Sequence, residues 1–138
     1  NWKNLLEFRN MQEKLEKLNK SNSFFFGSTG TKVMITTGDP TFSARKTEVV
    51  DVVNGESCAD LADFPLDTYG AVGAYLEETP VVCGGLYSSY YQTCYKYTNT
   101  GWQQFASMNE KRGYAAGITY KNKFHVFGGT DGSSIKDN

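Results

Sequence analysis

This sequence lacks both an excess of charge of one sign and long apolar runs. Its 14 lysine and arginine residues face 15 aspartate and glutamate residues, which gives a formal net charge of -1. Because binding to nucleic acid or to an anionic membrane surface depends on a field of positive charge, this balance argues against both partners. No apolar run reaches the roughly 18 residues that a membrane-spanning helix needs, so we expect no membrane insertion. The chain begins at Asn1 without a signal-peptide pattern, which we interpret as a mature, processed or excerpted product.

Histidine and cysteine are scarce. The chain has one histidine, His125, and three cysteines, Cys58, Cys83 and Cys94, with no CxxC spacing among them. Zinc sites need clustered Cys and His ligands, so the sequence predicts no metal and no cofactor. Cys83 and Cys94 flank an expected β-hairpin and are candidates for a disulfide; the alternative is three reduced, buried thiols in a cytosolic protein. In an oxidising compartment the odd cysteine would need an outside partner or stay a free thiol.

An internal repeat is the main positive feature. A shift of 44 residues carries Gly84 and Gly85 onto Gly128 and Gly129, and the whole segment 69–85 lies without a gap over 113–129. A weaker copy over 32–58 has a Gly-Asp-Pro turn in place of the double glycine, and we align its Gly38 with Gly84. Self-similarity at such a period indicates a repeat architecture in which units stack on one another.

Each repeat unit is expected to form four short antiparallel strands. In the best copy they cover about 70–76, 79–83, 92–98 and 102–106, with turns between them. The double-glycine strand, the following tyrosines and tryptophan, and the segment "RGYAAGITYKNKFHVFGGTDGSS" resemble the kelch repeat over about residues 32–138. That resemblance implies a mainly β fold of kelch-type β-propeller blades. The cysteine pattern further resembles extracellular kelch-like proteins of invertebrates and implies a secreted protein.

The repeat departs from the kelch pattern at both ends. The first copy lacks the double glycine and has Cys58 where the tryptophan would stand. About two to three blades are too few to close a ring of four to eight. We therefore expect further blades from residues outside these 138, or the sharing of one propeller by several chains.

The segment before the repeats has a different character. Residues 1–21 contain no proline or glycine and place Phe8, Met11, Leu15 and Leu18 at heptad-like spacing, which predicts an amphipathic helix. We expect it to be the end of a longer oligomerising coiled-coil helix, or otherwise a helix docked on the propeller or a helix of an assembly partner. Residues 22–31 are expected to be a linker. Asn19 begins an Asn-Lys-Ser glycosylation sequon, which has meaning only outside the cell.

Catalytic residues are not evident. Galactose oxidase, an enzyme related to kelch propellers, implies a copper site with imidazole ligands, which His125 alone cannot supply. His125 aligns with Val81 and is interpreted as a packed or edge-facing strand residue. A Ser-His-Asp or Cys-His arrangement is equally unsupported. We therefore expect no enzyme activity.

Recognition remains as the expected role. Tyr87, Tyr90 and Tyr91 lie at the tip of the expected hairpin and form a candidate binding loop, because tyrosine offers large contact area with few rotatable bonds. The alternative is that these rings pack on a neighbouring blade. The sequence thus predicts a noncatalytic protein-interaction or structural module of an extracellular assembly, with protein partners or a homo-oligomer. A carbohydrate-binding propeller is the alternative, and a copper oxidase is a weaker third.

Overall fold

The computed structural model describes residues 28–29, 32–38, 45–51, 53–58 and 61–137. Over these residues the chain is mainly β, as expected, and no helix in this part is long and apolar enough to cross a membrane. The expected helix 1–21 with Asn19 lies outside the described residues. Part of the expected linker is a strand, because Ser28 and Thr29 pair with Val33 and Lys32.

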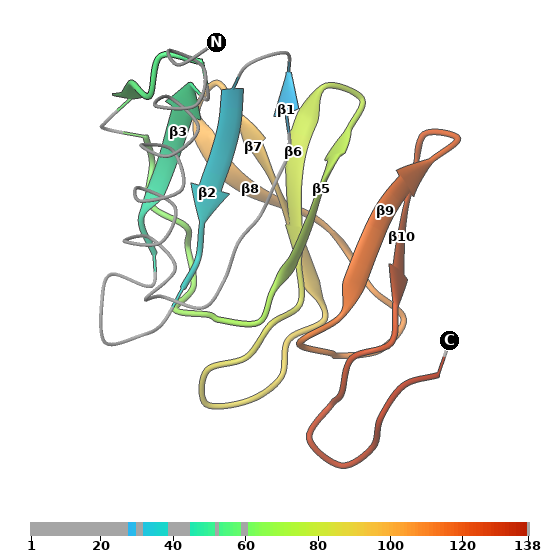
Figure 1. Ribbon diagram of the computed structural model, residues 1–138. Coiled ribbons are helices and arrows are strands. Elements are labelled where there is room, and N and C mark those ends of the chain that lie inside the picture. Colours follow the sequence, from blue (N-terminus) through green and yellow to red (C-terminus); the bar gives the residue numbers. More distant parts are fainter. Residues whose placement is uncertain (1–27, 30–31, 39–44, 52, 59–60, 138) are drawn as a thin grey trace, which may run out of the picture.

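Three antiparallel sheets make up the described chain and stand side by side in Figure 1. The first has the order β1-β2-β3-β4, the second the order β5-β6-β7-β8, and the third is the hairpin β9-β10. We refer to them as the first, second and third units. The strands are β1 (Ser28–Thr29), β2 (Lys32–Thr36), β3 (Thr47–Asp51), β4 (Ser57–Cys58), β5 (Val72–Leu76), β6 (Thr79–Cys83), β7 (Thr93–Thr98), β8 (Gly101–Ser107), β9 (Ala116–Tyr120) and β10 (Lys123–Phe127).

The second and third units repeat each other at the level of backbone dihedrals. A shift of 44 residues carries the bounds of β5 and β6 onto those of β9 and β10. The two-residue turns between these strands have positive φ at both positions, 48° and 60° at Glu77 and Glu78 and 48° and 55° at Lys121 and Asn122. Positive φ at both central residues is what a tight hairpin turn of type I′ requires. The repeat read from the sequence is therefore also a structural repeat.

The first unit is offset by one residue from the alignment predicted above. A shift of 47 carries β2 onto β6, so Thr37, with φ of 63°, takes the place of Gly84, with φ of 68°. Gly38 corresponds to Gly85 instead: its N–H donates to the Thr68 carbonyl (3.1 Å), as that of Gly85 donates to the Arg112 carbonyl (2.9 Å). The prediction was wrong because it used glycine as the marker of the left-handed residue, and here a threonine adopts that conformation.

The tryptophan position of the first unit needs the same correction. Val50 pairs with Ser57 in the first unit, and its counterpart Tyr97 pairs with Trp102 in the second. Ser57, rather than the predicted Cys58, therefore stands where the tryptophan would be.

Two apolar clusters hold the units together. The first lies between the first and second units and centres on Met34, Phe64, Ala74 and Val82. The second joins the second unit to the hairpin β9-β10 and centres on Val72, Val81, Cys83 and Cys94, with Phe124 and Val126 of β10 packed against it. Both faces of the second unit are thus covered by a neighbour, as the alternation of strand side chains allows.

Candidate functional site

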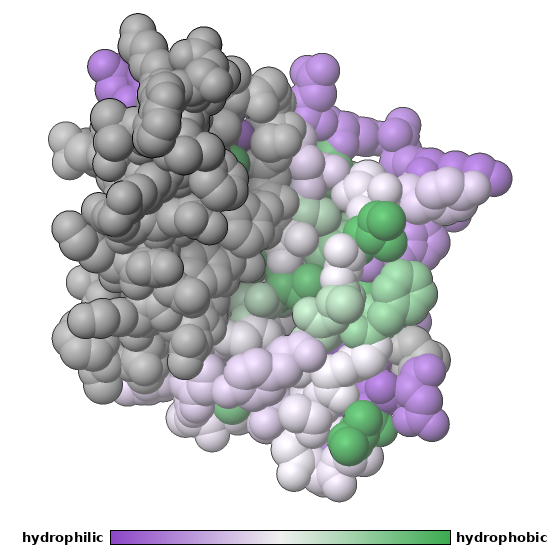
Figure 2. All heavy atoms as spheres, in the orientation of Figure 1, coloured by the Kyte–Doolittle hydropathy of each residue, from purple (hydrophilic) through white to green (hydrophobic). Residues whose placement is uncertain are grey.

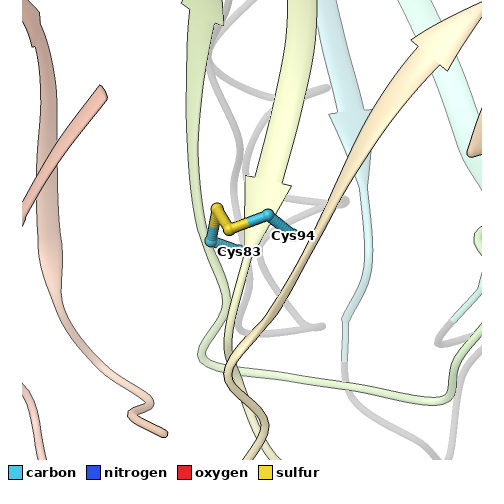
Figure 3. Close-up of a disulfide and its surroundings, with 2 residues drawn as sticks. All are labelled: Cys83 and Cys94. Atoms are coloured by element: carbon cyan, nitrogen blue, oxygen red, sulfur yellow. A yellow bond between two sulfur atoms is a disulfide. The ribbon is translucent and has the colours of Figure 1, made fainter. Parts of the chain in front are cut away.

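A disulfide fixes the base of the predicted binding loop. Cys83 at the end of β6 and Cys94 in β7 are directly opposite each other and are bonded, with their Cα atoms 4.1 Å apart (Figure 3). The pairing that the sequence left open is therefore present. The matching site of the first unit holds Thr36 and Thr47, which are buried and share a hydrogen bond of 2.9 Å between their hydroxyls.

Backbone hydrogen bonds then dock the loop onto the connection that leads into the third unit. Gly84 N–H donates to the Thr93 carbonyl (3.0 Å) and Tyr91 N–H to the Gly85 carbonyl (2.8 Å), which closes the loop on itself. Gly85 N–H donates to Arg112 and Arg112 N–H donates to Tyr91, at 2.9 and 3.0 Å. Because both ends are fixed to a neighbouring unit, the loop is a rigid support for its side chains.

The three predicted loop tyrosines have different surroundings. Tyr87 is 51% exposed, whereas Tyr90 and Tyr91 are half-buried. The Tyr90 ring lies between two glycines of the third unit: a Cβ added at Gly132 would be 2.7 Å from it, and one added at Gly113 would be 3.3 Å away. Tyr90 therefore packs on the neighbouring unit, whereas the Tyr87 ring is exposed to solvent.

Two further tyrosines lie at the same end of the sheets. Tyr69 precedes β5 and Tyr114 precedes β9, and their ring centroids are 6.3 Å apart. Tyr114 N–H donates to the Gly70 carbonyl (2.8 Å), and the Tyr114 ring lies against the Gly70 backbone. We call Tyr69, Tyr90 and Tyr114 the tyrosine cluster.

The repeat explains why the Tyr69 and Tyr114 rings lie close together. The second unit has Tyr69 followed by Gly70, and the third unit has the inverted order, Gly113 followed by Tyr114. Tyr114 therefore stands at the position of Gly70 and shares its left-handed backbone, with φ of 57° against 63°. Sequence reasoning missed Tyr114, although the alignment of a tyrosine with a glycine was visible. A bulky residue at positive φ costs of order 1–3 kcal/mol and is worth relating to function.

The electrostatic environment of Tyr114 agrees with this arrangement. Partial burial raises the pKa of its hydroxyl, and the neighbouring Tyr69 and Tyr90 hydroxyls raise the pKa further. The Tyr114 phenol therefore stays neutral and can act as both donor and acceptor at physiological pH. The side chain is nevertheless 58% exposed.

An ion network holds the adjacent loop of the third unit. The Lys136 ammonium lies 3.0 Å from Asp131 and 3.0 Å from Glu110. The Asp131 carboxylate also accepts hydrogen bonds from the backbone and hydroxyl groups of Ser133 and Ser134. Donation from Lys136, and then from the two serines, holds the pKa of Asp131 far below its ordinary value of 3.8. This network fixes the loop that flanks Tyr90.

His125 is placed among aromatic rings. It is half-buried in β10, stacked on Phe127 with ring centroids 6.2 Å apart, and 6.4 Å from Tyr120. Among the residues that the structure describes, no three His, Cys, Asp or Glu side chains gather as metal ligands would.

Comparison with known proteins gives the fold alone. No protein-family model matches the chain, and no curated protein matches it significantly. Among solved structures, 104 chains match. One of them, described as "Structure of YjhT", has a TM-score of 0.72 and 16% sequence identity over 86% of this chain. The match covers 41% of that chain, so this protein spans about two fifths of its length.

Proposed function

We propose that this protein is a noncatalytic protein-interaction or structural module built on kelch-like β-propeller blades and belonging to an extracellular assembly. The support for blades is the stacking of antiparallel sheets that repeat at sequence intervals of 47 and 44 residues, with the same hairpin turn geometry in the second and third units. A stack of this kind presents its connecting loops at the ends of the sheets, where side chains can vary without disturbing the strands.

The observation that carries the proposal is the exposed aromatic surface at one end of the sheets. Tyr87 and Tyr114 are 51% and 58% exposed although the backbone beneath them is fixed by hydrogen bonds. Rigid, exposed tyrosines are typical of binding surfaces, because they bury large area at low entropic cost. Tyr114 also keeps an unfavourable backbone conformation that its glycine counterpart would relieve.

The disulfide supports an extracellular setting. Disulfides persist in oxidising compartments and are rare where the cytosolic thiol pool is reducing. The Cys83–Cys94 bond is therefore compatible with secretion.

Carbohydrate binding is the second candidate, because exposed tyrosine rings also stack on sugars. It predicts binding to particular glycans on an array and loss of that binding when Tyr87 or Tyr114 is removed. An array without hits would remove this candidate and leave protein partners.

The test of the proposed function is selection of binders from a library of displayed extracellular protein fragments. Tyr114→Gly removes the exposed ring and introduces the residue that the repeat already tolerates at Gly70, so the fold should be kept. The matched control is Phe105→Ala, which removes an aromatic side chain that is 42% exposed on β8, outside the tyrosine cluster. We expect selected fragments to bind the control like the parent and to bind Tyr114→Gly at least about tenfold more weakly, as for a hot-spot residue. Equal binding to both variants would contradict the proposal.

A further inference from the structure

The turn between β3 and β4 holds an asparagine that is followed by a glycine. Asn54 and Gly55 are both exposed, and Figure 2 shows hydrophilic residues at the surface at the upper left, where this turn lies in Figure 1. Asn54 is the only asparagine of the sequence with glycine as its next residue. A Cβ placed on Gly55 would meet nothing within 4 Å, and glycine itself carries none. The Gly55 nitrogen therefore has room to react with the neighbouring side-chain amide.

Hydrogen bonds within the turn orient the Asn54 side chain. The Glu56 N–H donates to the Asn54 Oδ1 (3.0 Å), and the Asn54 Nδ2 donates to the Glu56 carboxylate (3.2 Å). The backbone is held as well, because the Asp51 carboxylate accepts from the Asn54 N–H at 3.4 Å. Since both polar atoms of the side-chain amide bond the residue beyond Gly55, the amide is folded back over the peptide bond that joins Asn54 to Gly55.

The two contacts with Glu56 match the charges that develop when a nitrogen attacks an amide carbon. Negative charge builds up on Oδ1, and the Glu56 N–H is already directed at this oxygen, as a backbone donor is in an oxyanion hole. The leaving nitrogen needs a proton, and the Glu56 carboxylate lies within hydrogen-bond reach to carry one to it. The attacking nitrogen belongs to the next residue, so the reaction is intramolecular and its barrier is lower.

We propose that Asn54 is a site of spontaneous covalent modification, in which its side chain is deamidated through a cyclic imide with Gly55. The Gly55 nitrogen bonds to the Asn54 Cγ as the bond from Cγ to Nδ2 breaks, and the proton lost by Gly55 leaves with Nδ2 as ammonia. Water then opens the imide at one of its two carbonyls. Opening at Cγ gives aspartate at position 54. Opening at the backbone carbonyl gives isoaspartate, in which the main chain runs through the former side chain.

The modification weakens the turn that joins β3 to β4. Aspartate at position 54 lacks the amide donor that bonds Glu56 and places a third carboxylate beside those of Asp51 and Glu56. Isoaspartate also adds a backbone atom between these two residues, and the Asp51 N–H donates to the Glu56 carbonyl at 2.8 Å to close the turn. β4 pairs with β3 through two described residue pairs, so the loss of the turn should release β4. None of these contacts involves the tyrosine cluster, and the inference stands or falls separately from the proposed function.

Two other asparagines serve as references within the same molecule. Asn99 and Asn122 are also exposed in hairpin turns, but Thr100 and Lys123 follow them. A side chain on the following residue crowds the attacking nitrogen, and a β-branched side chain is the stiffest. Turn position and exposure are thus shared by the three asparagines, whereas the following glycine belongs to Asn54 alone.

The experiment is incubation of the whole 138-residue chain at neutral pH and physiological temperature for several weeks. Peptide mass spectrometry then separates asparagine, aspartate and isoaspartate at each position. We expect conversion at Asn54 to be at least about tenfold faster than at Asn99 or Asn122. Glu56→Gln keeps the backbone N–H and removes the carboxylate, so conversion should slow by at least about threefold. The matched control is Glu78→Gln, which changes an exposed glutamate between β5 and β6 and should leave the rate unchanged.

Two results would overturn the proposal: an Asn54 that stays intact, or conversion no faster than that of the two reference asparagines. An unchanged rate in Glu56→Gln, or equal slowing in the Glu78→Gln control, would overturn the role assigned to the turn. Hydrogen exchange of the converted protein tests the consequence. Amide protection should fall at Ser57 and Cys58, and equal protection before and after conversion would refute the release of β4.

Discussion

Trp102 offers the most direct test of how the first and second units are joined. It belongs to β8 of the second unit, yet its indole N–H donates to the Thr47 hydroxyl of β3 in the first unit (3.0 Å). Its ring makes edge-to-face contacts with Phe64 and Tyr97, at centroid distances of 5.0 and 5.2 Å. Phe64 is 2% exposed, so the contact lies in the first apolar cluster.

Trp102→Ala removes the hydrogen bond, both ring contacts and most of the buried volume. Truncation of a packed tryptophan costs about 3 to 5 kcal/mol of unfolding free energy, and we expect the lower part of this range because Trp102 is half-buried. The hydrogen bond contributes about 1 kcal/mol of this, and each aromatic pair about 0.5 to 1.5 kcal/mol beyond area burial. A domain has only about 5 to 15 kcal/mol in total, so the variant should be close to unfolding.

The matched variant is Trp102→Phe, which keeps a ring and loses the N–H. Thr47 remains hydrogen-bonded to Thr36, so no buried hydroxyl is left without a partner and the expected loss is about 1 to 2 kcal/mol. The measurement is urea unfolding followed by far-ultraviolet circular dichroism. A loss below about 0.5 kcal/mol for Trp102→Ala would refute the reasoning, because such a value is typical of an exposed residue without structural contacts.

Three further predictions follow from the repeat and the ion network. The double variant Cys83→Thr, Cys94→Thr copies the threonine pair of the first unit and should fold. Its unfolding free energy should be lower by about 2 to 3 kcal/mol, because the disulfide no longer constrains the unfolded chain. Failure to fold would show that the disulfide is indispensable. Glu78→Gly should raise the unfolding free energy by up to about 1 kcal/mol, because glycine adopts positive φ without strain. Asn122→Gly at the equivalent turn position should raise it by less, because asparagine already tolerates positive φ. The reverse order of the two effects in denaturant unfolding would contradict this. The depressed pKa of Asp131 means that its network contributes its full stability above the ordinary pKa of 3.8 and loses that stability only as pH falls through the lower folded pKa. A carboxyl titration by NMR with an ordinary midpoint for Asp131 would disprove the network.

Much of the second and third units could be predicted because local signals and the repeat agree. The expected strand 79–83 has the observed bounds of β6, and the other three expected strands differ by one or two residues at their ends. Turn residues, β-branched residues and glycines all lie where hairpin geometry needs them. The first unit was harder, since Thr37 adopts the left-handed conformation that the sequence analysis assigned to a glycine.

The binding surface was predicted only in part. The loop of Tyr87, Tyr90 and Tyr91 was identified from composition, but which ring is exposed depends on contacts with a loop more than 40 residues away, such as that of Tyr90 with Gly132. The meeting of Tyr69 with Tyr114 depends on the stacking of two units, which a strand-by-strand reading does not contain. Side-chain exposure is set by tertiary packing, and local pattern does not determine it.

One cross-strand site shows how the repeat separates framework from function. The position at the end of the second strand of each unit holds a buried hydroxyl pair in the first unit, Thr36 and Thr47, and a disulfide in the second, Cys83 and Cys94. In the third unit it holds Phe127, which is half exposed and pairs with Ala116 of β9, with no described strand on the other side of β10. The backbone geometry is the same, so it does not depend on which of these side chains occupies the site. The chemistry of the site instead decides how the two strands are joined there: by a hydrogen bond between hydroxyls in the first unit and by a covalent bond in the second.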